Sequence, residues 1–130
     1  MAGATVRMTS KKQNTLQAIH EKIHYIEGAE QISKSESVIN GVTICTLAYE
    51  KYFFRTGSYA SVTVVLTEFE EEQTAFVVAA GGGDGIANIS YGANHNFANA
   101  CVLALEECGF TVAESDIEIQ RKGLLKRLFK

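Results

Sequence analysis

The chain has 130 residues, 46% of them hydrophobic and 21% charged, and its formal net charge at pH 7 is −3. These values are typical of one globular domain and exclude the disordered and membrane-spanning classes. The charge is uneven, because residues 121–130 hold five cations and no acid, which leaves seven cations against fifteen acids in residues 1–120. An acidic body argues against a nucleic-acid partner, since phosphate neutralisation needs a basic face.

The first predicted element is a helix that begins after residue 13. Residues 1–13 are small and polar, with no apolar core of the signal-peptide type, so we expect a cytoplasmic protein. Asn14 or Thr15 can cap the helix, and Gly28 is a suitable stop. The apolar spacing gives this helix one buried face, formed by Leu16, Ile19, Ile23 and Ile26.

A β-hairpin is predicted next, around Asn40-Gly41. Asn-Gly between β-branched residues is the strongest short-range hairpin signal, because both central turn positions favour positive φ. The strand after this turn covers residues 42–54. Both faces of that strand are fairly apolar, so the face that the helices leave uncovered can serve as a subunit interface or a pocket.

Two further strands, 59–69 and 74–80, follow tight turns and complete a meander. Residues 59–69 alternate as half-buried antiparallel strands do, with an apolar side formed by Ala60, Val62, Val64 and Leu66. A glycine run over residues 81–85 then breaks the pattern, and residues 86–91 suit one more short strand.

A second amphipathic helix is predicted from Asn94, its cap, to Gly109. Its apolar residues are Phe97, Cys101, Val102, Leu105 and Cys108. Residues 110–119 suit a strand or an ordered loop. The predicted fold is therefore α+β, a two-layer sandwich of an antiparallel β-meander of about four to five strands packed against two helices. Residues 1–120 are predicted to form a single domain, and residues 121–130 a basic amphipathic C-terminal tail.

The string His20-Glu21-Lys22-Ile23-His24 has the spacing of a zinc-hydrolase helix. Two histidines four residues apart can bind one Zn²⁺, and the glutamate between them can act as general base on metal-bound water. A third ligand is needed, but Glu30 stands where a metzincin has its histidine, and Glu50 has no confirming motif. On the predicted helix, Glu21 points away from the apolar face and His24 lies toward solvent. We therefore favour surface histidines with no metal or cofactor, and zinc bound by His20 and His24 remains the alternative.

The glycine run is the candidate ligand site. It fails the dinucleotide-binding fingerprint, because Ile86 and Asn88 occupy the positions of the last glycine. The favoured interpretation is a sheet corner that only glycine tolerates. The alternative is a nest of backbone amides that binds a small anion or small molecule. The residues of that site would be Gly81, Gly82, Gly83, Asp84, Gly85, Asn94 and His95.

Two groups of side chains are expected in the core. Three cysteines, odd in number and without CxxC spacing, are interpreted as small buried hydrophobes: Cys45, Cys101 and Cys108. Five aromatic residues are interpreted as core or cross-strand pairs, with self-association or ligand stacking as the alternatives: Tyr49, Tyr52, Phe53, Phe54 and Tyr59.

The basic tail has an apolar helical side among its cations, formed by Leu124, Leu125, Leu128 and Phe129. Such a segment can dock on the acidic body of its own or a neighbouring chain, or it can contact an anionic membrane or a partner groove.

Several short segments together resemble a known family. They are residues 49–55, 60–64, 81–85, 90–93 and 96–97. The stretch from about residue 15 to residue 110 is similar to an uncharacterised family of small bacterial proteins, a domain of unknown function; the glycine run and the Ser-Tyr-Gly-Ala step at 90–93 are its distinctive parts. The resemblance implies a bacterial, cytoplasmic α+β protein with no assigned activity and transfers no catalytic residue.

These features favour a non-catalytic domain that self-associates as a homo-oligomer or binds a small ligand. One alternative is a zinc-dependent hydrolase that uses residues 20–24. The other is a membrane-surface or protein-interaction adaptor that acts through the tail, which would be its only membrane contact.

Overall fold

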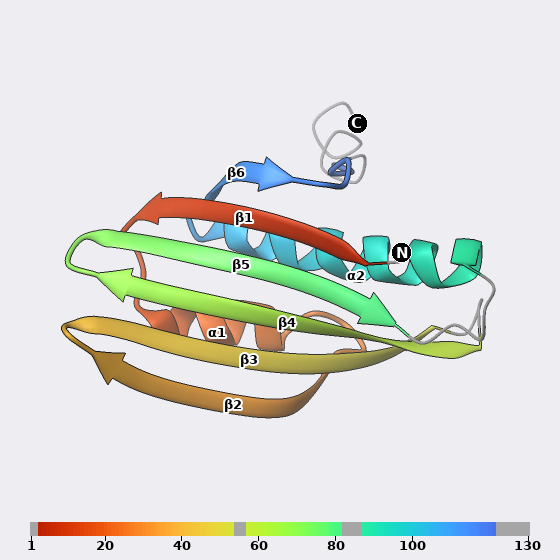
Figure 1. The fold of residues 1–130 in the computed structure, drawn as a ribbon, viewed down its shortest axis with the longest axis horizontal. Helices are drawn as coiled ribbons and strands as arrows, with labels where there is room; N and C mark the ends of the chain where they lie inside the picture. The colour runs from red at the N-terminus through yellow and green to blue at the C-terminus, as the bar shows by residue number, and fades with distance from the viewer. Residues whose placement is uncertain (1–2, 54–56, 82–86, 122–130) are drawn as a thin grey trace.

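The computed structural model describes residues 3–53, 57–81 and 87–121. Six strands form one antiparallel sheet in the order β2-β3-β4-β5-β1-β6, and both helices lie behind it in Figure 1. The elements are β1 (Ala4–Lys11), α1 (Leu16–His24), β2 (Glu30–Ile39), β3 (Val42–Phe53), β4 (Ser58–Phe69), β5 (Glu72–Gly81), α2 (Ala87–Glu107) and β6 (Thr111–Ser115). The predicted α+β sandwich is confirmed, with more strands than expected.

The hairpin-built meander forms where the turn signals predict it. Asn40 and Gly41 have φ values of 49° and 82°, as the turn between β2 and β3 requires. Glu70 has a φ of 55° in the turn between β4 and β5, and β5 begins at Glu72, two residues earlier than expected. The predicted apolar side of β4 is buried, from Ala60 to Leu66.

The N-terminal segment is a strand, which the sequence analysis missed. β1 lies between β5 and β6 and pairs with both. Its alternate residues Ala4, Val6 and Met8 are fully buried. Three alternating apolar residues are a weak strand signal, so the sequence analysis treated this segment as small and polar.

α1 begins with the predicted cap, since the Thr15 hydroxyl accepts a hydrogen bond from the Ala18 amide at 3.1 Å. The helix ends at His24, before Gly28, which has a φ of 80°. Ile19 and Ile23 bury its apolar face.

α2 is longer than predicted, because it begins at Ala87. The strand expected over residues 86–91 is therefore wrong, and Asn94 is a buried residue within the helix rather than its cap. The local helix propensity of this segment, which contains glycine and asparagine, is weak, so the sequence does not indicate a helix there. Gly109 follows the end of the helix with a φ of 98°.

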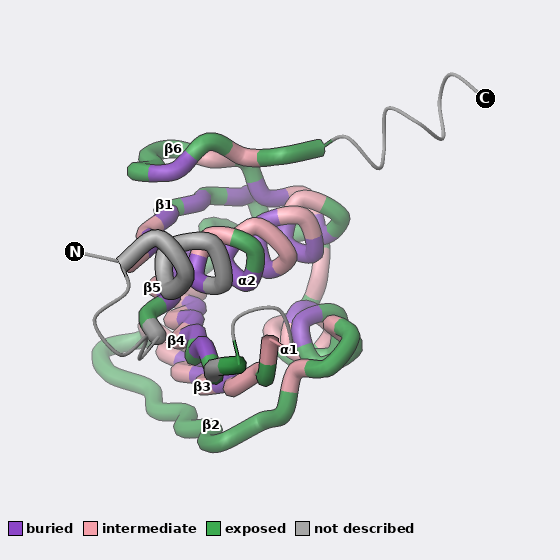
Figure 2. Tube along the Cα trace, turned by 90° about the vertical axis from the view of Figure 1, so that its right-hand side faces the viewer, coloured by how far each residue is buried: buried purple, intermediate pink, exposed green. Residues whose placement is uncertain are grey.

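The core fills the space between the helices and one side of the sheet. α2 packs on β5, β4 and β1, and its Phe97 ring lies 6.4 Å from that of Phe53 on β3. Figure 2 shows the buried residues concentrated between these layers. We call the sheet side under the helices the covered face and the opposite side the open face.

Candidate interaction surface

The open face of the three central strands is apolar at its centre. Cross-strand partners in an antiparallel sheet point to the same side, so the register assigns each residue to a face. On β3, β4 and β5 the only charged residues on the open face are Glu50 and Glu72. Its large apolar residues are Val42, Ile44, Val65, Phe69, Phe76 and Val78. A sheet face that meets only water is usually polar at alternate positions, so this composition needs an explanation.

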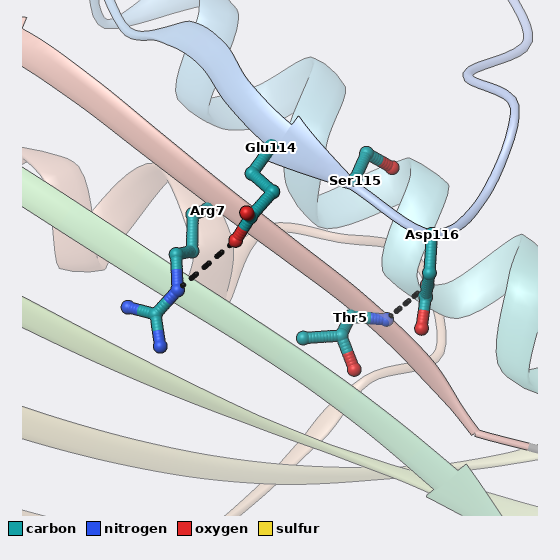
Figure 3. A pocket seen from close by; sticks show the side chains of 5 residues that line it. All are labelled: Thr5, Arg7, Glu114, Ser115 and Asp116. Atoms are coloured by element: carbon teal, nitrogen blue, oxygen red, sulfur yellow. Dashed lines mark hydrogen bonds and ion pairs between the residues drawn. The ribbon is translucent and has the colours of Figure 1, made fainter.

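One cross-strand row connects the apolar centre to a charged border. Val65 pairs with Phe76, and Phe76 pairs with Arg7. The Arg7 guanidinium carbon lies 4.2 Å from the Phe76 ring centroid, in a cation–π arrangement. Arg7 Nε also lies 3.6 Å from Glu114 Oε1 on β6 (Figure 3). The guanidinium is thus held by a ring and a carboxylate within the same protein.

A shallow recess of about 270 Å³ opens at this border, between β1 and β6. Figure 3 shows its lining, which includes Arg7, Glu114 and Asp116. Asp116 Oδ1 accepts a hydrogen bond from the Thr5 amide at 2.7 Å. The Arg7–Glu114 ion pair and the hydrogen bond from the Thr5 amide to Asp116 hold β6 against β1 at this border.

Aromatic rings stand at both ends of the open face. Tyr52 and Tyr59 form a cross-strand pair with ring centroids 5.0 Å apart. Phe69, at the opposite end of β4, is 47% exposed. The expected cross-strand aromatic pairing is confirmed for these tyrosines. Tyr49 is instead fully buried on the covered face, and Phe54 lies outside the described residues.

The zinc-like string does not gather a set of metal ligands. His20 is half-buried, His24 and Glu21 are exposed, and the two imidazole centroids lie 5.8 Å apart. The described part of the chain contains no group of three or more His, Cys, Asp or Glu side chains placed to hold a metal ion. The residues present therefore do not fit a zinc site, and we assign no metal chemistry to this string.

His20 instead anchors the edge strand β2 to α1. Its Nε2 lies 2.7 Å from Gln31 Oε1, which also accepts a hydrogen bond from the Tyr49 hydroxyl at 3.2 Å. Since a carbonyl oxygen can only accept, Nε2 carries the proton. Burial raises the pKa of Tyr49 to about 12, so this hydroxyl stays protonated and keeps donating to Gln31.

The predicted glycine-run site lies mostly outside the described residues, because these omit Gly82–Gly85. Gly81 ends β5, paired with Ala60. His95 Nε2 lies 2.9 Å from the Glu118 carbonyl oxygen, which ties α2 to the segment after β6. A helix rather than the expected short strand follows this run, since α2 begins at Ala87.

The cysteines behave as the sequence predicts. Cys45, Cys101 and Cys108 are free thiols and all are buried. Burial raises the pKa of each thiol, that of Cys101 to about 12. A protonated, buried thiol is a poor nucleophile, which supports a structural role.

The tail beyond Arg121 lies outside the described residues. Arg121 itself donates from Nε to Glu106 Oε1 at 3.0 Å, and this bond raises the pKa of its guanidinium. None of the helices in the described ranges is long and apolar enough to cross a membrane.

The model of a family of unknown function, DUF6054, matches residues 1–109. The chain belongs to this family. No curated protein matches it. The matched region contains β1 to β5 and both helices, so the sheet and the layer that covers it are the family's shared part, whereas β6 lies beyond the match.

Sequence reasoning missed two parts of this surface. Arg7 and Phe76 were not considered, because β1 was not recognised and the alternation in β5 was not assigned to faces. A usable signal was present, since Thr74, Phe76 and Val78 alternate with Ala75, Val77 and Ala79, which makes both sides of β5 apolar.

Proposed function

We propose that this protein is a non-catalytic, self-associating domain in which two copies pack their open faces together. The observation that carries the proposal is the apolar centre of the open face around Val65, Phe76 and Val78, which no element of the described chain covers. Removing apolar surface from water favours association by roughly 25 cal/mol per Å², before the entropic cost of association.

The size of the open face supports a second copy as the occupant. The strands from β2 to β1 lie about 4.8 Å apart and rise about 3.3 Å per residue, so this face measures about 24 Å by about 33 Å. Its area of about 800 Å² is what each partner buries in an interface of standard size. A second copy offers the same area and composition, and two stacked sheets pack about 10 Å apart.

Light scattering coupled to size exclusion tests the proposal. The wild-type protein should show a mass of at least two chains of 14.2 kDa each. Val65→Lys places a charge at the centre of the open face, where its desolvation should weaken association by more than about 100-fold and halve the measured mass. Gln17→Lys makes the same charge change on the exposed side of α1 and should leave the mass unchanged.

Two results would overturn this proposal. One is a wild-type mass of 14.2 kDa at all concentrations. The other is a Val65→Lys variant with a wild-type mass and an unchanged thermal midpoint, because it would show that the open face is not part of any contact between copies.

A further inference from the structure

β2 is an edge strand that is exposed along its whole length. It ends the sheet on one side, and all ten of its residues are exposed, as its colour in Figure 2 shows. An edge strand presents a row of unpaired N–H and C=O groups to which another strand can pair. The opposite edge, β6, has five residues, so β2 offers by far the longer row.

The sequence of β2 is chemically self-complementary about Ser35. When two copies of an antiparallel strand pair with Ser35 opposite Ser35, the two residues on either side of Ser35 meet complements. Opposite charges meet opposite charges and hydroxyls meet hydroxyls. The pairs are Lys34 with Glu36 and Ser33 with Ser37.

We infer that β2 pairs antiparallel with β2 of a second copy, with Ser35 on the two-fold axis. The pairing uses the backbone edge of β2 rather than its open-face side chains, and it does not depend on the function proposed above. Residues 33–37 of each copy overlap in regular register, which allows about four to six backbone hydrogen bonds. The contact is isologous, since both copies use the same strand. Because it occupies the long edge of both copies, the pairing stops at two copies.

The charged pairs fall on a defined side of the joined sheet. Lys34 and Glu36 pair with Leu47 and Cys45, which are buried on the covered face. The two charges therefore lie on the helix side of β2, beyond the area that the helices cover. Because the two-fold axis is perpendicular to the sheet, the helices of both copies stay on the same side.

The edge strand is held in place before it pairs. Gln31 is fixed by His20 and Tyr49, and the register shift between Gln31 and Ser33 confines the irregularity to one end of β2. Pairing thus costs less conformational entropy than it would for a mobile segment. The axis of face packing lies parallel to the sheet, so both interfaces can coexist in a tetramer of closed symmetry.

Disulfide trapping tests the register. In the proposed pair the two Ser35 β-carbons lie about 4.5–5.5 Å apart, close enough for a disulfide after a small adjustment. Ser35→Cys should form a covalent dimer under mild oxidation. Ser37→Cys lies on the same strand and the same side, but its two copies would be about 13 Å apart and should not cross-link. An equimolar mixture of Ser33→Cys and Ser37→Cys should form the mixed dimer.

Charge reversal tests the complementarity. In the Val65→Lys background, where β2 is the remaining contact, Lys34→Glu opposes like charges twice and should weaken the dimer about tenfold. Glu36→Lys should do the same. The combined Lys34→Glu, Glu36→Lys variant restores both pairs and should regain the starting affinity.

Equal cross-linking at positions 35 and 37, or no rescue by the combined variant, would overturn the β2 pairing. Neither result bears on the open face, whose own test is the effect of Val65→Lys on mass. The reverse also holds, because an unchanged mass in Val65→Lys leaves the position-35 cross-link as a valid test of β2.

Discussion

The covered and open faces of the sheet share the same strands but have different surroundings. Val64 and Val65 are consecutive in β4, and the first is fully buried under the helices while the second is half-buried among its strand neighbours. Both faces carry branched and aromatic residues. Hydrophobic content alone therefore does not distinguish the face that packs in the core of one chain from the face that is available to a partner.

The polar residues separate the two faces. Threonines recur among the apolar residues of the open face, as at Thr46, Thr63 and Thr67, whereas the covered face at the same level carries Leu47, Val64 and Leu66. A mixture of apolar and hydroxyl side chains with few charges tolerates water before association and excludes it afterwards. This composition differs from that of the core and is consistent with the proposed contact between copies.

The same truncation in the core under the covered face and on the open face should give the largest contrast. Phe97→Ala removes a fully buried ring on α2 and should lower the free energy of unfolding by about 3–5 kcal/mol. Phe76→Ala removes a half-buried open-face ring and its contact with Arg7, and in dilute solution it should cost about 1 kcal/mol. Urea unfolding followed by circular dichroism measures both. Equal losses would mean that the open face is part of the monomer core.

A polar replacement sharpens the contrast with almost no change in shape. Val64→Thr buries a hydroxyl beneath the helices and should cost about 2 kcal/mol, because the group leaves water without an assured partner. Val65→Thr adds one more threonine to a face that already has several and should stay within about 0.5 kcal/mol of wild type. Thermal and urea unfolding of both variants provide the measurement. A large loss for Val65→Thr would contradict the assignment of the two faces.

Local signals were sufficient for the meander. Asn40-Gly41 identified the first hairpin, since few other dipeptides accept positive φ at both positions. The alternation of Ala60, Val62, Val64 and Leu66 identified the covered side of β4. In each case the information lies within a few neighbouring residues.

Elements that depend on distant contacts were predicted poorly. β1 is a strand because it pairs with β5 and β6. Both partners lie more than sixty residues away in the sequence, and Ala4, for example, pairs with Ala79. α2 extends back to Ala87 through a segment whose own helix propensity is weak. The candidate interaction surface was missed for the same reason, because Arg7 and Phe76 come together only when β1 pairs with β5.

Alkaline pH should give the smallest effect, through a thiol of α2 that is buried against the covered face. Burial raises the pKa of Cys101 from its usual 9 to about 12, so above pH 9 the unfolded chain releases a proton that the folded protein keeps. The resulting stability is fully present well below pH 9 and is lost as the pH rises toward 12, by about 1.4 kcal/mol at pH 10. Cys101→Ala should therefore lose less stability than wild type between pH 8 and pH 10 in paired urea titrations. The Cys101→Ala substitution also changes packing, but by the same amount at all pH values. The quantity to compare is therefore the slope of the unfolding free energy against pH. Identical slopes would show that the thiol ionises as easily in the folded protein as in water, and that water reaches the core between α2 and the sheet at this position.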